Sequence, residues 1–394
     1  MPLGIYISVP FCKSKCSYCN FATGVVSKAA YARYVDRLSA DVANAEETAR
    51  SLGGVFERTV DSIFLGGGTP TLLDPTDLER IFRTVREHFA VAPNAEITVE
   101  CAPGTLTPVL LETLLRCGVN RVSLGVQSWV DAEAAAVGRL HTRARVLEDI
   151  AALRSAGISD INVDLIAGLP HQTPESWAYS VSETIASEVP HASVYMLEVD
   201  EDSRLGRELL AGGVKYHAHF VPDDDLSADF YSEACVRLDA AGIQQYEISN
   251  FARSGRESRH NLKYWQRGPY FGFGVDAHSM LPALAGSRQS VRFAAADDLN
   301  TFMTNPPLAR TEVSRSAAFE ETFFLGLRLV HGVDLRAVAR DFGGASVSGL
   351  ARILDELVAD GLLERSDETI RLTPRGRLLS NEVFQRFLTV SAIN

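Results

Sequence analysis

Three cysteines near the N-terminus, Cys12, Cys16 and Cys19, have the spacing of ligands to a metal centre. Their C-x3-C-x2-C pattern directly follows the apolar, β-branched run GIYISVP, which predicts a strand that ends at Pro10. The cysteines are therefore expected on one loop at the carboxyl end of that strand. Their spacing is too close, and their number odd, for a disulfide framework. Three thiolates on one loop can instead converge on one metal centre.

The number of thiolates favours an iron–sulfur cube over zinc. A closed structural zinc site takes four ligands, and the next possible ligands, His88 and Cys101, lie far along the chain. An iron–sulfur cube contains four irons, so three cysteines leave one iron open to a small molecule. A zinc site and a set of buried structural thiols remain the alternatives. Cys101, Cys117 and Cys235 belong to no motif and are expected to be structural thiols.

The composition is typical of a soluble globular protein. The chain has 394 residues, of which 46% are apolar and 22% charged. No segment approaches ~20 consecutive apolar residues, and the N-terminus lacks a basic region, so we expect neither a transmembrane segment nor a signal peptide. Cysteines gathered for a metal fit a reducing cytoplasm. The formal net charge of −12 disfavours nucleic acid as a partner, because phosphate binding needs a basic face.

Strands and helices are predicted to alternate through the first half of the chain. Strand-like apolar runs occupy residues 60–65, 96–100, 120–124, 158–166 and 192–197. Helical periodicity marks residues 29–52, 108–117, 143–156 and 174–187. This alternation predicts an α/β fold with a parallel sheet of about six βαβ units.

Polar side chains fall where these predicted strands end. Besides the cysteines they are Thr69, Glu100, Gln127, Asp164 and Glu198. In α/β barrels the carboxyl face of the sheet carries the chemistry. A structural ion pair is the alternative for each carboxylate taken singly, but their gathering on one face favours a binding site.

The middle of the chain predicts less regular structure. Residues 201–225 are charged and contain glycines, which indicates an irregular excursion or lid before a helix at 226–241. A strand is expected at 246–249. Residues 245–280 are rich in aromatics and include His260 and His278, which suits either a flat hydrophobic ligand or an aromatic core patch. Residues 281–311 are expected to be irregular.

The tail predicts a winged-helix-like, mostly helical domain. Helices are expected at 317–330, from Val347 and at 374–388, with a hairpin before the last one. From Thr311 to the end there are ten Arg, no Lys and twelve acidic residues, a net charge of −2, which disfavours DNA binding. We therefore divide the chain into residues 1–240, a barrel, 241–310, a ligand-associated segment, and 311–394, the C-terminal domain.

The cysteine motif, together with the segment GGGTP at residues 66–70, resembles the radical S-adenosylmethionine (SAM) enzymes. Taken alone, the three glycines would equally be a tight turn before a helix. The resemblance implies a partial (β/α)6 barrel and a [4Fe–4S] cluster held by Cys12, Cys16 and Cys19, with SAM on the open iron. By position, it also implies that SAM is contacted by Tyr6, Tyr18, Gly67, Gly68, Thr69, Glu100, Gln127, Arg139 and Asp164. Glu198 matches less closely.

Longer segments resemble one group within that superfamily. GGGTPTLL, RVSLGVQSW, VGRLH, NVDLIAGLPHQT and YEISNFA are similar to the group of oxygen-independent coproporphyrinogen III oxidases and HemW-type heme chaperones. The oxidase pattern has a fourth cysteine where Phe21 stands in this chain. RHNLKYW resembles the H-N-x-x-Y-W signature of the HemW branch, which is associated there with heme. This resemblance makes His260 the leading candidate for the heme ligand, since histidine is a natural axial ligand.

The resemblance implies a cytoplasmic heme chaperone that binds heme and delivers it to acceptor hemoproteins. The sequence leaves the oligomeric state open, with a homodimer as one candidate. The alternatives are a coproporphyrinogen III oxidase and a two-SAM radical methyltransferase. No catalytic residue is assigned. Two segments depart from the family: its E-x-N-P is Glu100-Cys101-Ala102-Pro103 in this chain, and its G-x-G-A-H is Gly274-Val275-Asp276-Ala277-His278.

Overall fold

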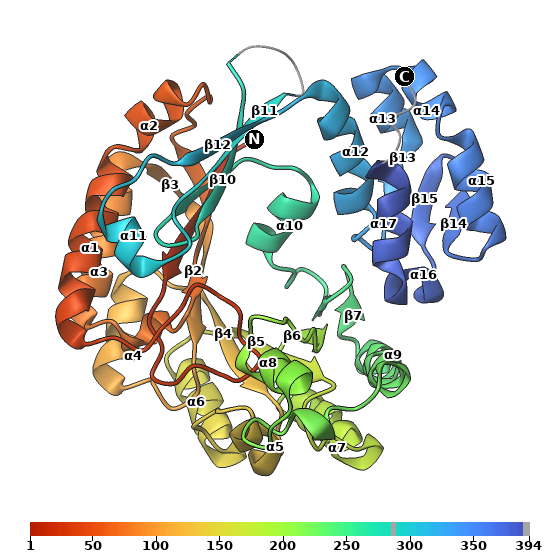
Figure 1. Ribbon diagram of the computed structural model, residues 1–394. Helices are drawn as coiled ribbons and strands as arrows, with labels where there is room; N and C mark the ends of the chain where they lie inside the picture. Colours follow the sequence, from red (N-terminus) through yellow and green to blue (C-terminus); the bar gives the residue numbers. More distant parts are fainter. Residues whose placement is uncertain (285–288, 389–394) are drawn as a thin grey trace.

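A curved sheet of twelve strands forms the centre of the computed structural model, which describes residues 1–284 and 289–388 (Figure 1). Its middle is a run of six parallel neighbours in chain order: β1 (Leu3–Val9), β2 (Thr59–Gly67), β3 (Ala90–Cys101), β4 (Arg121–Gln127), β5 (Asp160–Ala167) and β6 (His191–Met196). The predicted α/β fold with a partial six-unit barrel is therefore confirmed.

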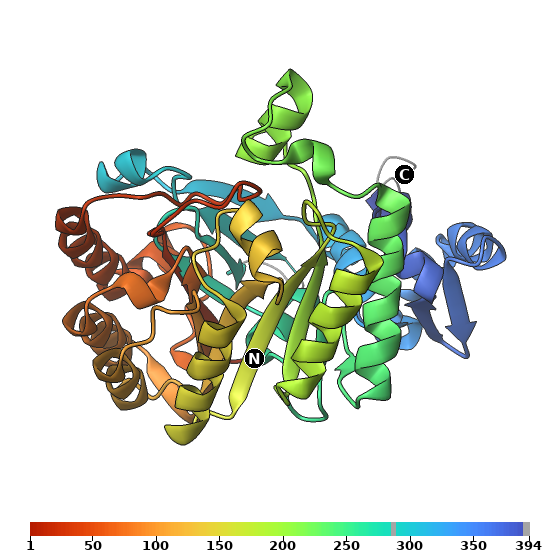
Figure 2. The same cartoon turned by 90° about the horizontal axis from the view of Figure 1, so that it is seen from below.

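Helices cover the outer face of the parallel strands, as Figures 1 and 2 show. They are α1 (Lys28–Ala43), α2 (Ala45–Ser51), α3 (Pro75–His88), α4 (Pro108–Arg116), α5 (Asp131–Ala136), α6 (Arg143–Ser155), α7 (Pro174–Ala186) and α9 (Asp224–Ala240), with the short 3-10 helix η1 (Pro70–Leu72) after β2. Side-chain alternation along β1 explains this layering. Its odd-numbered residues, Leu3 to Val9, are all fully buried beneath α1, so Gly4, Tyr6 and Ser8 face the barrel interior.

The sheet continues beyond both ends of the parallel run. On one side β9 (Tyr270–Phe273) pairs with β1 and is followed by β10 (His278–Pro282), β11 (Ser290–Ala294) and β12 (Ala309–Val313). The helix α11 (Leu299–Met303) lies between the last two. The expectation of irregular structure at 281–311 is therefore wrong, because Val291 and Phe293 alternate into the core as a strand requires.

At the other end of the sheet, two short strands replace the one predicted at 246–249. They are β7 (Gln244–Gln245) and β8 (Asn250–Ala252), the latter antiparallel to β6. The buried Glu247 turns the chain between them by accepting hydrogen bonds from Ser249 N at 2.9 Å and from Asn250 Nδ2 at 2.5 Å. The predicted strand was therefore wrong: a carboxylate placed to bond the following amides builds a turn.

The range 201–225 is more regular than expected. It contains the helix α8 (Arg204–Ala211) and the 3-10 helix η2 (Ala218–Phe220), which project from the barrel in Figure 2. Ser203 begins α8 by accepting a hydrogen bond from Gly206 N at 2.9 Å, a helix cap. We use the name lid for residues 197–223.

The C-terminal region packs around a hydrophobic core of its own. Its helices and strands are α12 (Arg315–Gly326), β13 (Val333–Asp334), α13 (Leu335–Phe342), α14 (Gly344–Ser348), α15 (Ala351–Ala359), β14 (Leu363–Ser366), β15 (Thr369–Leu372), α16 (Pro374–Leu378) and α17 (Ser380–Leu388). The predicted mostly helical domain is confirmed, and the exact domain boundaries stay a prediction. In Figure 1 the helix α10 (Arg259–Trp265) lies between this region and the barrel. Within the described ranges, none of the helices has the length and apolar character needed to cross a bilayer.

Candidate cluster and SAM site

A cavity of about 520 Å³ opens at the carboxyl ends of the parallel strands. The structure gathers in its lining nearly all the residues singled out from the sequence: Cys12, Cys16, Cys19, Tyr18, Gly67, Gly68, Thr69, Glu100, Gln127, Arg139 and Asp164. Glu198 lines it too. The convergence follows from topology, because parallel neighbours end at one edge of the sheet.

The cysteine loop is fastened at its base. Phe11 is fully buried and stacks on Tyr31 with ring centroids 4.0 Å apart. Backbone bonds join Cys12 N to Gly24 O at 3.0 Å and Ser17 N to Val137 O at 3.1 Å. All three motif cysteines are free thiols. In the described part of the chain no three or more His, Cys, Asp or Glu side chains are close enough to hold a single metal ion. The loop thus presents three thiols around a cavity rather than a tight single-ion cage.

Glycines form the wall next to the cysteines. Gly67 has φ +95°, and a Cβ at Gly68 would lie 2.6 Å from the carbonyl oxygens of both Val9 and Phe11. Gly68 N and Thr69 N donate to those same oxygens at 2.9 and 2.7 Å. These contacts let the glycine segment approach the cysteine loop closely and leave room for a ligand above it.

Tyr6 is the SAM candidate that the cavity does not include. A Cβ placed on Gly67 would be 3.3 Å from the Tyr6 hydroxyl, so Tyr6 lies directly beneath the glycine wall. Burial and the nearby Glu100 raise the pKa of Tyr6 well above its ordinary value. Tyr6 therefore stands as a neutral group that supports the cavity floor.

Two carboxylates face one another across the cavity. Glu100 accepts a hydrogen bond from Gly67 N at 3.1 Å, and burial together with the charge of Asp164 raises the pKa of Glu100 to about 8. Asp164 accepts from Ser123 Oγ at 3.1 Å and from Asn162 Nδ2 at 2.7 Å, and burial raises its pKa too. A ligand with hydroxyl or ammonium donors would stabilise both ionised groups.

The Arg139 guanidinium brings a positive charge to the same cavity. It donates to the carbonyl of Gly125 and lies 3.6 Å from Cys16 Sγ. Its Nε is buried and has no hydrogen-bond partner among the described residues. An unsatisfied buried donor of this kind is costly, and a ligand carboxylate would satisfy it. Thiols, carboxylates and the Arg139 cation on a single cavity thus fit a cluster and an amino-acid ligand.

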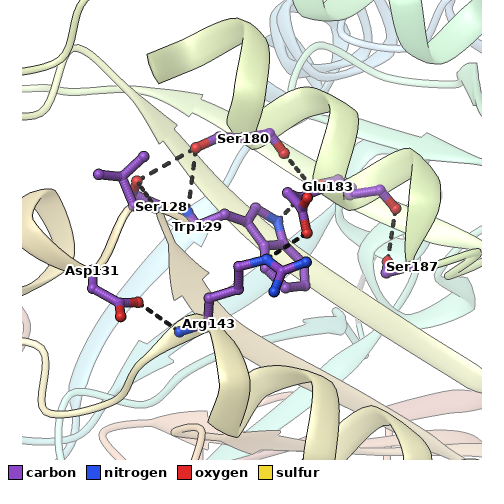
Figure 3. Close-up of polar contacts among 9 residues, drawn as sticks. Ser128, Trp129, Asp131, Arg143, Ser180, Glu183 and Ser187 are labelled. Atoms are coloured by element: carbon purple, nitrogen blue, oxygen red, sulfur yellow. Dashed lines mark hydrogen bonds and ion pairs between the residues drawn. The ribbon is translucent and has the colours of Figure 1, made fainter.

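Figure 3 shows the polar contacts of the segment that follows β4 and begins directly after Gln127. The fully buried Trp129 donates from Nε1 to Thr184 Oγ1 at 2.8 Å and from its backbone N to Ser180 Oγ at 3.3 Å. Arg143 donates to Glu183 at 2.7 Å in the same view. These bonds attach the end of β4 and the start of α6 to α7, so Trp129 of the QSW segment has a structural role.

His141 of VGRLH is part of that support. Its Nε2 lies 3.1 Å from the carbonyl of Val126, and burial and Arg139 lower the pKa of His141 to about 4. It stays neutral at ordinary pH and fixes the turn between Gln127 and Arg139.

His260 lies elsewhere, towards the amino ends of β1 and β2. Its Nδ1 is 3.0 Å from Ser62 Oγ and its Nε2 is 3.0 Å from the Tyr264 hydroxyl. A Cβ on Gly4 would be 3.3 Å from its ring. Glu96 anchors the helix by accepting from the backbone N of His260 at 3.0 Å. His260 is 1% exposed, and burial lowers its pKa to about 3. Both nitrogens are thus occupied in this conformation.

Sequence reasoning missed the polar lining of the barrel. Asn162 Nδ2 donates to Ser123 Oγ at 2.7 Å and to Ser193 Oγ at 3.0 Å. Tyr195 and Met196, at the end of β6, form the cavity wall next to the lid. A signal was present: polar residues recur every second position along β5 and β6, which places them all on the inner face.

The comparisons with known proteins agree with this geometry. Residues 6–182 match the radical SAM superfamily model and residues 313–379 the HemN C-terminal domain. The chain is 33% identical to Heme chaperone HemW of Bacillus subtilis over 97% of this chain and 98% of that protein. It is also 33% identical to Heme chaperone HemW of Mycobacterium tuberculosis strain CDC 1551, covering 98% and 95%.

A solved structure shares the whole fold. It is the coproporphyrinogen III oxidase HemN of Escherichia coli, a radical SAM enzyme, with a TM-score of 0.82, 24% identity and coverage of 98% of this chain and 90% of that one. The superfamily assigns a [4Fe–4S] cluster and SAM as cofactors, which confirms that part of the sequence analysis. The cavity, its cysteines and the full-length likeness lead to one conclusion: this chain belongs to the HemW family of radical SAM proteins.

Proposed function

We propose that this chain is a heme chaperone, which binds heme and passes it to acceptor hemoproteins. The observation that carries the proposal is 33% identity over essentially the full length to proteins named Heme chaperone HemW. Phe21 supports it, since it stands where the oxidase pattern has a fourth cysteine and is 62% exposed at the cavity.

We further propose that Cys12, Cys16 and Cys19 hold the cluster. The carboxylates Glu100 and Asp164 bind donor groups of SAM, the glycine wall receives its amino-acid end, and Arg139 binds its carboxylate. The remaining SAM contacts are assigned to Tyr18, Thr69 and Gln127, and Tyr6 supports the floor. When bound, the cluster and SAM together supply one-electron chemistry.

Several further features of the protein belong to the same proposal. We place it in the cytoplasm, where its thiols stay reduced, and propose that it acts as a homodimer without nucleic acid. His260 of the H-N-x-x-Y-W segment stays a predicted heme ligand. Iron could reach it only if its bond to Tyr264 or Ser62 were broken.

Heme transfer from the reconstituted protein tests the proposal. The protein is loaded anaerobically with its cluster and with hemin, then mixed with increasing amounts of a heme-free cytochrome. For contact-mediated delivery, the transfer rate rises with acceptor concentration. A rate independent of acceptor, equal to passive hemin loss, contradicts delivery.

The oxidase alternative has its own readout. Coproporphyrinogen III, SAM and a reductant are incubated with the same preparation, and tetrapyrrole products are analysed. We expect no loss of propionate carboxyl groups. Conversion to protoporphyrinogen IX would replace the chaperone proposal with the oxidase.

A further inference from the structure

Accessible histidines concentrate on the lid. Three of the nine histidines, His141, His191 and His260, are buried. Of the other six, half belong to one small region: His217 and His219 lie in or next to η2 of the lid, and His171 lies in the loop after β5. This region adjoins the cavity through Met196 and Leu197.

The lid is tied to the cysteine loop on one side. Leu205 N donates to Ser17 O at 2.8 Å, and Asn20 Nδ2 donates to Asp200 Oδ2 at 2.9 Å. Its far end is ordered by Glu208, whose carboxylate accepts from the backbone N of Tyr216 at 2.8 Å and of Ala218 at 3.2 Å. The histidines of the lid therefore have a defined position relative to the cavity.

His171 and His217 form a hydrogen-bonded pair. His171 Nε2 and His217 Nδ1 are 3.1 Å apart, and the His171 ring stacks on Phe220 with centroids 4.2 Å apart. The backbone of His171 also donates to Phe220 O at 2.9 Å. Both histidines have left-handed backbone, with φ 70° and 62°, which is uncommon for residues other than glycine. The ring pair is held in place from two sides.

This geometry leaves one nitrogen of His217 for a metal. With the proton on Nδ1, His217 donates to His171 Nε2, and its own Nε2 keeps a lone pair with no hydrogen-bond partner in the part of the chain that the structure describes. Metal-binding histidines characteristically donate their second ring N–H in this way, which fixes the tautomer and the ring orientation.

The lid segment that carries His217 also exposes apolar side chains. Leu209, Leu210, Val214 and Phe220 are 50%, 68%, 83% and 57% exposed, all within twelve residues of the lid. Exposed apolar side chains gathered in this way mark a binding surface. Lys215, exposed in the same segment, adds a cation suited to a carboxylate. A flat apolar ligand that carries an iron and carboxylates would meet all three features.

We infer that the lid binds heme, with His217 Nε2 as the axial ligand of the iron and His171 as its positioning residue. This inference rests on the proposed function and names a different site from the His260 segment. The iron–nitrogen bond uses the lone pair of neutral His217, so no proton leaves and no redox step is involved. Heme bound there lies beside the SAM cavity and open to an acceptor protein.

Hemin titration of the full-length, cluster-loaded protein tests the inference. His217→Asn removes Nε2, yet it keeps a side-chain donor near His171 and a residue that tolerates left-handed backbone. His171→Phe keeps the stacked ring and removes the acceptor, whereas His171→Gln retains an acceptor. His331→Asn, at an exposed site in the C-terminal region, is the matched control, and His260→Gln tests the other site.

We expect His217→Asn to weaken hemin binding at least tenfold and to remove the histidine-ligated Soret band. His171→Phe should weaken binding about tenfold and shift the iron–histidine stretching frequency of the ferrous form, with recovery in His171→Gln. His331→Asn should match wild type. Circular dichroism and cluster absorbance verify that each variant is folded.

Two results overturn the inference and differ from each other. If wild type binds hemin while His217→Asn and His171→Phe retain its affinity and spectrum, the lid is not the site and the chaperone proposal stands. Loss of binding in His260→Gln alone would then place heme at α10. If wild type itself does not bind hemin, the proposed function fails.

Discussion

Substituting Gly68 by alanine tests whether the glycine wall and the cysteine loop form one unit. The added Cβ would lie 2.6 Å from the carbonyl oxygens of Val9 and Phe11 and 2.9 Å from Phe11 N. All three atoms are backbone, so no side-chain rotation can relieve the contact. The chain leading to Cys12 has to move.

The cost can be estimated from these contacts. Overpacking of this kind costs about 1–3 kcal/mol. Moving the segment also disrupts the bonds from Gly68 N to Val9 O and from Thr69 N to Phe11 O, each worth about 1 kcal/mol. Together the substitution should destabilise the closed loop by about 3–5 kcal/mol, a hundred- to several-thousand-fold change in its opening equilibrium.

Anaerobic cluster reconstitution measures the effect. We expect Gly68→Ala to hold far less iron and sulfide than wild type and to lose its visible cluster absorbance on exposure to a chelator. Gly24→Ala is the matched control, because Gly24 pairs with Phe11 in the same loop and its Cβ would meet no atom within 4 Å. If Gly68→Ala retains its cluster as firmly as Gly24→Ala, the two segments do not form one rigid unit.

Three further outcomes follow from the geometry. Arg139→Gln should lower SAM affinity about 10- to 100-fold, as expected for a lost charged hydrogen bond, and should retain the cluster. Equilibrium dialysis measures the affinity, and an unchanged value contradicts the assignment of Arg139 to the SAM carboxylate. Glu321→Gln removes the charge that Arg267 and Arg292 share at 2.8 Å each; Glu321 and Arg267 are nearly buried, whereas Arg292 is 37% exposed. Because the variant leaves the buried Arg267 charge without its counter-charge, urea unfolding should show a loss of about 3–5 kcal/mol. Glu364→Gln, at a half-exposed ion pair, should cost under about 1 kcal/mol, and equal losses would refute the argument. The pKa of His260 falls from an ordinary 6.5 to about 3 on folding, so the unfolded chain takes up the proton first and the free energy of unfolding declines as pH falls below about 6.5. Between pH 7.5 and 5.5, His260→Gln should therefore lose about 1.4 kcal/mol less stability than wild type. An equal pH dependence of unfolding in the variant and wild type contradicts this prediction.

The sequence predicted the residues that line the cavity more completely than it predicted the strands of the sheet. Three cysteines on a strand end, and polar residues at the ends of later parallel strands, have to meet because parallel strands present their carboxyl ends at one edge. The inner polar network was missed, although Asn162 and Asp164 share one face of β5. Their role depends on which strands become neighbours, and local spacing does not contain that information.

The antiparallel part of the sheet shows the same limit. Residues 290–294 alternate in burial as a strand does, yet the segment is short and lies next to stretches without periodicity. Its pairing with β10 and β12 comes from contacts with residues distant in sequence. Tertiary pairing therefore decides structure that propensity leaves open.

The position of His260 determines where a heme bound to that residue would lie. Ser62, which bonds His260, and Gly67, which lines the cavity, belong to the same strand five residues apart, a separation of ~16 Å along β2. A heme held by His260 would thus lie towards the amino ends of the parallel strands, at the opposite end of the barrel from the SAM cavity. A heme held by His217 would lie on the lid, whose helix α8 is bonded directly to the cysteine loop. Only with heme at His217 does one connected segment, the lid, contact both the SAM cavity and the heme. Binding of SAM and exchange of heme can then act on the same segment.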